Sequence, residues 1–349
     1  MNILSIDLGK YKSVFCMYET TTNKHNFGNL KTTPQEVHDL IVSQSPFRVV
    51  FEIGTAAGWI TDIAKALGKE VEVANTTHEA WRWKNTKRKT DRDDALKLAQ
   101  LSAMNQLPKV HIPKKDTREK RAFIQYRQKL VRRRTQIKNT IRALLQREGI
   151  HMSIGQNAWT KDGLKWLRSI AMPLGKVNNP DDLWKGQLHT ELKQLNGISE
   201  AIQKVEAKLD RIGKADTQVQ RLQTVAGVGP RAAEAIVAFI DDPHRFDNAK
   251  QVGSYIGFTP RRYQSSDVDI YGKISKQGNK LLRSLLVEIS WIALRYNPWA
   301  RDMYNRVLKG DKKRKKAAIV ALARKILVRC WAMMRDQTEW AQSSSKIAA

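Results

Sequence analysis

The stretch MNILSIDLG, residues 1–9, is a short apolar run that ends in Asp7, Leu and Gly. RVVFEIG, residues 48–54, repeats this design, with Glu52 followed by Ile and Gly. Both runs have the length and composition of buried strands, and each carries an acid where the strand ends. An unpaired carboxylate within an apolar run is unfavourable, so Glu52 is a candidate for a functional site.

The rest of residues 1–110 alternates between strand and helix patterns. The sequence predicts further strands at SVFCMYE, NFGNLKT and EVEVANT, and helices at PQEVHDLIVSQ, GWITDIAKALG and DRDDALKLAQLSAMNQL, the last stopped by Pro108. Three strands in succession, followed by alternating helices and strands, predict a mixed sheet covered by helices. Residues 1–110 are therefore predicted to form one α/β domain.

Residues 111–215 are predicted to be a basic coiled-coil region. Within them, residues 114–149 carry 13 Lys and Arg against 3 acids, a net charge of +10, with a roughly heptad apolar stripe at Leu130, Ile137, Ile141 and Leu144. A second stripe consists of Leu188, Leu192, Leu195, Ile202, Val205 and Leu209. Two such helices predict an antiparallel coiled coil, within one chain or between chains. A Trp-containing insertion, AWTKDGLKWL, separates them.

Residues 216–349 are predicted to be a mostly helical domain. TVAGVGPRAAEAIVAFI resembles half of a helix-hairpin-helix, in which Gly227 and Gly229 would let backbone N–H groups approach a phosphate. The alternative is an ordinary glycine-rich helix entry. TPRRYQSSDVDIYGKISKQGN, residues 259–279, is predicted to be a loop before two long helices. The basic residues there either hold phosphates or form a solvated face: Arg261, Arg262, Lys273, Lys276 and Arg283.

The composition indicates a polyanionic partner. The 349 residues include 62 Lys and Arg against 34 Asp and Glu, a net charge of +28, which favours nucleic acid over a membrane. No apolar run reaches the roughly 20 residues of a membrane span, and the N-terminus does not read as a signal peptide. Cys16 and Cys330 are isolated, so neither a disulfide framework nor a zinc site is expected, which suits a reducing cytosol.

A cluster of acids in KTDRDDALKLA, residues 89–99, stands out in so basic a chain. Asp91 and Asp94 lie three residues apart and share a helix face. Together with Asp7 and Glu52 they offer four hard-oxygen ligands for one or two Mg²⁺ ions, as phosphodiester chemistry uses. The alternative is that Asp91 caps the helix and the strand-end acids are surface residues. Asp93 is predicted to face solvent.

IDLGK, FEIGT and KTDRDDA, in this order and at this spacing, resemble the RuvC-like, RNase H-fold catalytic domain with a DEDD acid set. The chain is similar to the DEDD transposases of the "one-ten/eleven-eleven" insertion-sequence family, which includes the pilin-gene invertases. AWTKDGLKWL resembles the longer branch. GFTPRRYQSSDVDIYGKISKQGNKLLRSLL resembles the family's second domain and is the most specific signal.

The resemblance implies a site of two parts. The acids would be Asp7, Glu52, Asp91 and Asp94, holding Mg²⁺, and a serine nucleophile in the second domain would join covalently to a DNA strand end. That serine falls at Ser265. The family usually has Ser-Gly there, whereas this chain has Ser265-Ser266-Asp267, so Ser266 remains open. Judged alone, the segment reads as a polar loop with turn-forming Ser and Asp.

The resemblance also implies partners. A structured guide RNA from the element would pair with target and donor DNA, and the active protein would be a tetramer in the bacterial cytoplasm, associated with the nucleoid. Arg132, Arg133 and Arg134 are predicted phosphate contacts or an exposed coiled-coil face, and Trp81 and Trp83 either stack on bases or pack in the core. Two other functions stay open: a metal-dependent endonuclease that uses water, and a non-catalytic nucleic-acid-binding protein.

Overall fold

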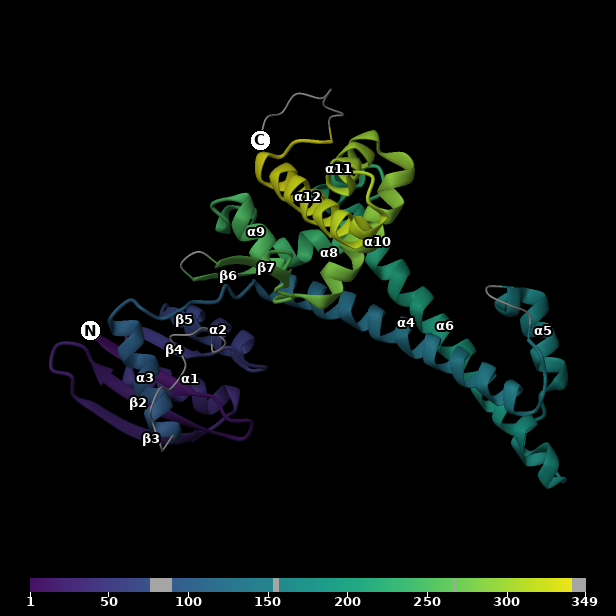
Figure 1. The fold of residues 1–349 in the computed structure, drawn as a ribbon. Coiled ribbons are helices and arrows are strands. Elements are labelled where there is room, and N and C mark those ends of the chain that lie inside the picture. The colour runs from purple at the N-terminus through teal and green to yellow at the C-terminus, as the bar shows by residue number, and fades with distance from the viewer. Residues whose placement is uncertain (76–89, 153–156, 266–267, 341–349) are drawn as a thin grey trace. The chain divides into compact units, whose positions relative to one another are not determined.

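The computed structural model describes residues 1–75, 90–152, 157–265 and 268–340 (Figure 1). The chain divides into two units, Met1–Arg118 and Glu119–Ala349. Helix α4 (Lys115–Arg147) begins in the first unit and continues into the second. The predicted boundaries at residues 110 and 215 stay predictions, and each unit is described by itself below.

The first unit is built on a five-stranded mixed sheet in the order β3-β2-β1-β4-β5. β1 pairs antiparallel with β2 and parallel with β4, while β2–β3 is antiparallel and β4–β5 parallel. The predicted strands are confirmed, and the topology is consistent with the RNase H-like domain that the resemblance implies. The strands are β1 (Asn2–Asp7), β2 (Lys12–Glu19), β3 (His25–Lys31), β4 (Arg48–Glu52) and β5 (Glu70–Ala74).

Helices cover both faces of this sheet. α1 (Pro34–Gln44) and α2 (Ala57–Ala66) pack on the face that carries Leu4 and Ile6, and α3 (Asp91–Ala103) packs on the opposite face. Successive side chains of a strand point to opposite faces. Each strand of this sheet therefore serves two cores, which explains the continuous apolar runs in β1 and β4.

α3 ends earlier than the sequence predicts. The helix was expected to reach residue 107, yet it ends at Ala103. Asn105 adopts a positive φ of 53°, and the Gln106 N–H donates to the Leu101 carbonyl at 2.8 Å. Asn tolerates the left-handed conformation better than most residues. The helix therefore stops at the asparagine, before the proline is reached.

Polar contacts fix the direction of α3 across the sheet. The Ser5 hydroxyl donates to the Ala95 carbonyl at 2.7 Å, near the start of the helix. At the other end, Arg48 Nη1 donates to the Ser102 carbonyl at 3.2 Å, and Ser102 Oγ donates to Glu72 at 2.7 Å. Because Arg48 begins β4, α3 runs antiparallel to β1 and β4. Its N-terminal turn therefore lies at the carboxyl ends of these strands.

Two long helices of the second unit form the predicted coiled coil within one chain (Figure 1). α4 packs antiparallel to α6 (Leu183–Lys214), since Leu130 shares a core with Val205, and Ile141 shares one with Leu188. Across the helix pair, Arg127 Nε donates to Glu206 at 2.9 Å. The insertion forms α5 (Lys161–Ile170), whose buried Leu167 joins the Ile141 cluster.

The remaining elements form a helical bundle with one hairpin. Its core joins the buried sides of the helices to one end of the coiled coil, and none of the described helices combines the length and apolar character that crossing a membrane requires. The helices are α7 (Thr217–Gln223), α8 (Pro230–Ile240), α9 (Ala249–Ile256), α10 (Lys280–Tyr296), α11 (Pro298–Leu308) and α12 (Lys315–Asp336). Short 3-10 helices lie at Asn157–Trp159, Leu174–Lys176, Pro180–Asp182, Pro243–Arg245 and Lys312–Arg314.

The segment predicted to be a loop, residues 259–279, is largely an antiparallel hairpin of β6 (Pro260–Ser265) and β7 (Val268–Ile274). Tyr263, Val268 and Ile270 are residues that favour strands. They alternate with polar neighbours, which is the period of a half-exposed strand. The prediction of a loop was wrong. Ser and Asp favour turns, but the residues on either side of them alternate as they do in strands.

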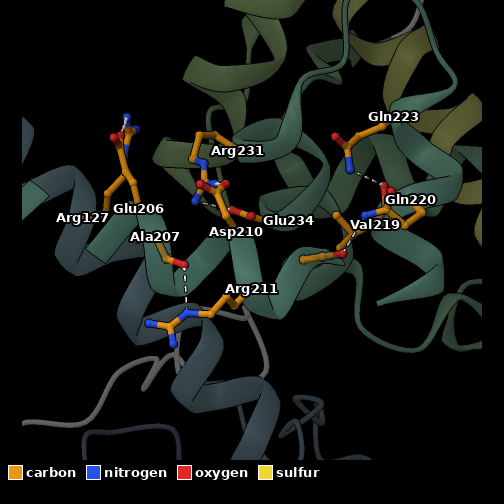
Figure 2. A network of polar contacts seen from close by, with 11 residues as sticks. Arg127, Glu206, Ala207, Asp210, Arg211, Val219, Gln220, Gln223, Arg231 and Glu234 are labelled. Carbon is orange, nitrogen blue, oxygen red and sulfur yellow. Dashed lines mark hydrogen bonds and ion pairs between the residues drawn. The ribbon is translucent and has the colours of Figure 1, made fainter. Parts of the chain in front are cut away.

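A buried carboxylate sits where α6 meets α8 (Figure 2). Glu234 is only 6% exposed and pairs with Arg231 Nη1 at 3.0 Å, while Arg231 also pairs with Asp210 of α6. Burial raises the pKa of the Glu234 carboxyl, and the nearby Arg231 only partly offsets this. The fold therefore favours the neutral form of this side chain.

Each unit carries one buried thiol, Cys16 in the first and Cys330 in the second. Burial raises the pKa of Cys16 to about 11 and that of Cys330 to about 12. Because the thiolate is the reactive form, neither reacts readily until its unit opens. The rate of thiol labelling therefore measures the unfolding of each unit separately.

Replacing Glu72 by Ala is expected to destabilise the first unit by roughly 3 kcal/mol, because Arg48 loses a buried partner. Glu72 is 3% exposed and also pairs with Lys109 at 2.5 Å. Labelling of Cys16 should accelerate while that of Cys330 stays unchanged. Glu70→Ala is the matched control: Glu70 also pairs with Arg48, at 2.9 Å, but its side chain is 43% exposed, so it contributes under about 1 kcal/mol. Equal rates for the two variants would contradict this role of Glu72.

Replacing Glu234 by Gln is expected to remove a pH-dependent contribution to the stability of the second unit, because Gln does not titrate. The raised pKa means that the wild-type carboxyl contributes most below its ordinary value of 4.5, and that this contribution is lost as pH rises through the raised pKa. Cys330 labelling, measured from acid to neutral pH, should therefore show a decline in stability that the Gln variant lacks. Parallel pH profiles would refute the assignment.

Candidate functional site

The four predicted acids are brought to one edge and one face of the sheet. Ile6 of β1 pairs with Phe51 of β4, so the next residues, Asp7 and Glu52, end adjacent parallel strands. By alternation from Ser5 and Val50, which face α3, both acids lie on the α3 side. The first turn of α3 carries the other two, Asp91 and Asp94.

Among the acids at the start of α3, Asp93 takes part in capping the helix. Thr90 is the N-cap: the Asp93 N–H donates to its hydroxyl at 3.3 Å, and the Thr90 N–H donates to the Asp93 carboxylate at 3.1 Å. This reciprocal pair is a capping box. The alternative in which Asp91 caps the helix is therefore wrong, whereas the predicted exposure of Asp93 is confirmed.

The chemistry of this edge suits a divalent cation. All four side chains offer carboxylate oxygens, the ligands that Mg²⁺ prefers, and Asp94 is held only 6% exposed. The positive end of the α3 dipole lies at the same edge, where it stabilises the ionised carboxylates. Within the described ranges, however, no three His, Cys, Asp or Glu side chains are grouped so that they could hold a metal ion. The donors thus share a location, and their side chains do not converge.

Ser265 lies in the second unit, at the end of β6. It is exposed and pairs in register with Val268, while Tyr263 pairs with Ile270. Residues two apart on a strand point to the same side, so Ser265 shares a face with Tyr263, Val268 and Ile270. The other candidate, Ser266, lies outside the described residues.

The base of the hairpin is firmly held. Arg283 Nη1 donates to the carbonyls of Ile256, Gln277 and Gly278 at 3.0, 2.6 and 3.1 Å. Gly257 and Gly278 have φ of 76° and 78°, and a Cβ on either would collide with backbone. Arg283, predicted to contact phosphate, therefore has a clear structural contact, and its phosphate role stays a prediction.

The other predicted basic residues of this region differ in their surroundings. Arg262 forms a two-pronged ion pair with Asp269, at 2.7 and 2.9 Å, so its charge is largely compensated. Arg261, Lys273 and Lys276 are exposed. A phosphate would find more uncompensated charge at these three than at Arg262.

The two glycines of the turn before α8 have different roles. Gly227 has φ of 102°, and a Cβ there would lie 2.8 Å from Ala293 Cα of α10. Its primary role is therefore to let the turn pack closely against α10. Gly229 begins α8 in open space, with nothing within 4 Å of an added Cβ. Phosphate contact there stays a prediction.

The basic patch on α4 extends further than the predicted triplet. Arg132 and Arg133 are exposed, and Arg134 is half-buried. Burial, followed by the charges of Arg134 and Arg142, lowers the pKa of Lys138. Lys138 and Arg142 lie over the Trp159 ring, 4.8 and 5.3 Å from its centre. Trp81 and Trp83 lie outside the described residues.

The apolar side chains that share a face with Ser265 and the anchoring role of Arg283 were not predicted from the sequence. The alternation of Tyr263, Val268 and Ile270 with polar residues was the signal for the hairpin. No comparable signal marks Arg283, because its acceptors are backbone carbonyls, at Gln277 and Gly278 just before α10 and at Ile256, 27 residues away.

Comparison with known families and proteins matches both units. Residues 4–149 match a transposase family model of the DEDD type, and residues 219–305 match the "Transposase IS116/IS110/IS902 family". The transposase of insertion sequence element IS1111A from Coxiella burnetii is 30% identical over 71% of this chain and 67% of its own length. A probable family 20 transposase from Pseudomonas aeruginosa is 26% identical over 97% and 98% of the two chains.

A pilin gene-inverting protein from Moraxella bovis is 27% identical over 71% of this chain and 66% of its own length. The first family match contains all four acids of the sheet edge, and the second contains Ser265. The chain belongs to the IS116/IS110/IS902 family of insertion-sequence transposases, enzymes that rearrange DNA.

Proposed function

We propose that this transposase cleaves and exchanges DNA strands through a covalent phosphoserine link at Ser265, with Asp7, Glu52, Asp91 and Asp94 holding Mg²⁺. The observation that carries the proposal is the placement of the four carboxylates at one edge and one face of the sheet, beside the N-terminus of α3. If the acids served only to cap α3, there would be no reason for acids at the ends of two neighbouring strands to lie beside them. Here Thr90 and Asp93 provide the cap.

In the proposed step, Ser265 Oγ attacks the scissile phosphorus. The Oγ–P bond forms as the bond from phosphorus to the leaving strand oxygen breaks. The serine proton passes to a base, and the leaving oxygen takes up a proton. The phosphoserine ester bond replaces the phosphodiester bond that breaks. Another strand end can therefore attack this ester and rejoin the DNA without an outside energy source.

The serine needs activation from elsewhere in the assembly. A serine hydroxyl is a weak nucleophile, and YQSSDVDIYGK contains no His. When bound, Mg²⁺ supplies Lewis acidity for the attacking and leaving oxygens. The carboxylates hold that charge at the strand-end edge, and Asp93 with Thr90 keeps the first turn of α3 in place.

A structured guide RNA and a tetrameric assembly are part of the proposal. The net charge of +28 suits a protein that holds two nucleic acids, and guide pairing relieves the protein of reading DNA sequence itself. The acids lie in the first unit and Ser265 in the second, so an oligomer can build one site from two chains. The protein would act in the bacterial cytoplasm, where nucleoid DNA is accessible.

Replacing Ser265 by Ala is expected to abolish a protein-linked DNA band on a denaturing gel, because the phosphoserine ester cannot form. The assay contains protein, Mg²⁺, element-end DNA and RNA transcribed from the element's flank. Ser266→Ala is the matched control and should retain the band. Nicked DNA that is never protein-linked, and that is unchanged in both variants, would instead identify a water-dependent endonuclease.

Replacing Asp7 by Asn is expected to remove the protection that Mg²⁺ gives the first unit. A cation that binds only the folded unit slows Cys16 labelling about tenfold when present at ten times its dissociation constant. Asp39→Asn, which changes an exposed acid of α1 on the opposite face of the sheet, is the control and should keep this protection. Undiminished Mg²⁺ protection in Asp7→Asn would show that the strand-end acid is no ligand.

A further inference from the structure

The hairpin of β6 and β7 has two unlike faces. One, here called the serine face, consists of Tyr263, Ser265, Val268 and Ile270, as the register and strand alternation require. The opposite face carries the Arg262–Asp269 ion pair, with Tyr271 beneath the Arg262 guanidinium at 5.4 Å. On this face Arg262 and Asp269 thus compensate each other's charge within the hairpin.

The serine face is exposed although three of its four side chains are apolar or aromatic. Tyr263 is 65% exposed, Ile270 58% and Val268 45%. A two-stranded hairpin is normally stable only when one face packs on something. Apolar side chains gathered in the open beside a polar rim mark an interaction surface.

The serine face is also held in a fixed orientation. Arg283 and the close backbone contacts at Gly257 and Gly278 anchor the base of the hairpin to the ends of α9 and α10. The Ser275 N–H donates to the Thr259 carbonyl at 2.8 Å, which closes the base. A ligand on this face therefore meets a preorganised platform whose end is the Ser265 hydroxyl.

We propose that the serine face binds the DNA strand that Ser265 attacks, and that Tyr263 stacks on the base next to the scissile phosphate. The inference rests on the proposed function. Tyr263 is two residues from Ser265 on the same side of β6, about 7 Å along the strand. A nucleotide whose phosphate lies at the hydroxyl can reach the ring. Tyr263 is thus a positioning residue, and Ile270 and Val268 extend its apolar platform.

Nucleic acid fits this face better than a second copy of the chain. The apolar area comprises only three side chains, whereas a stable protein interface buries about 1,200–2,000 Å². Arg261, Lys273 and Lys276 supply exposed positive charge nearby, which suits phosphates. Stacking on an aromatic ring accepts any base, as an enzyme that does not read DNA sequence directly requires.

The test uses the full-length protein with Ser265→Ala as background, so that no covalent product forms. The probe is an oligothymidylate with one 2-aminopurine, a base whose fluorescence falls when it stacks. We expect Tyr263→Ala to weaken binding roughly 5- to 150-fold and to abolish the fluorescence decrease. Tyr263→Phe should restore both. Tyr271→Ala, which removes a tyrosine 62% exposed on the opposite face, is the matched control.

Unchanged binding and quenching in Tyr263→Ala would overturn the proposal, as would equal losses in Tyr271→Ala. Sedimentation tests the rival occupant: dissociation of an oligomer by Tyr263→Ala, without loss of quenching, would assign the face to a second copy. Cys330 labelling checks that each variant remains folded. Because the assay needs no nucleophile, failure of the Ser265 mechanism leaves this result intact, and the two proposals fail separately.

Discussion

The placement of α3 across the sheet is the constraint on which the acid site depends. Buried hydrogen bonds add a directional constraint to the apolar packing of a helix on a sheet. Here the Ser5 hydroxyl donates to the Ala95 carbonyl. Arg48 donates to the Ser102 carbonyl, and the Ser102 hydroxyl donates to Glu72. These groups are buried, so leaving any of them unpaired is unfavourable. The helix therefore has one direction and one register, and its first turn reaches the ends of β1 and β4.

The acids at that edge show how one short segment places neighbouring side chains in different environments. Asp93 and Thr90 satisfy backbone groups of the first turn, a task that needs an exposed side chain pointing back along the chain. Asp94, one residue later, is turned by about 100° on the helix and is buried toward the sheet. Adjacent aspartates thus occupy opposite environments because helical geometry separates them.

The proposed division of the chemistry between two units would have a physical consequence. The carboxylates of the first unit would hold the cation, and Ser265 of the second unit would supply the nucleophile. Such a transposase would cut only when both parts meet, which would protect DNA from cleavage at random. The base of the hairpin is anchored, so the Ser265 hydroxyl already has a restricted position. Binding of DNA would therefore cost little additional conformational entropy at the hairpin.

The sequence by itself determined the strands and helices of the first unit, the coiled-coil stripes and the position of the acids along the chain. These are local or periodic properties: apolar runs, heptad spacing and turn residues act through the backbone within a few residues. It also placed Asp91 and Asp94 on one helix face, because their spacing follows from helical geometry alone.

Only the tertiary structure decided how Ser265 is surrounded and which backbone groups Arg283 binds. The capping box of α3 is different, because Thr90 and Asp93 are three residues apart and this spacing is a local signature. The serine face depends on pairing between β6 and β7, and Arg283 bonds to backbone groups up to 27 residues away. Such contacts join distant parts of the chain, and no local pattern encodes which partners packing will bring together.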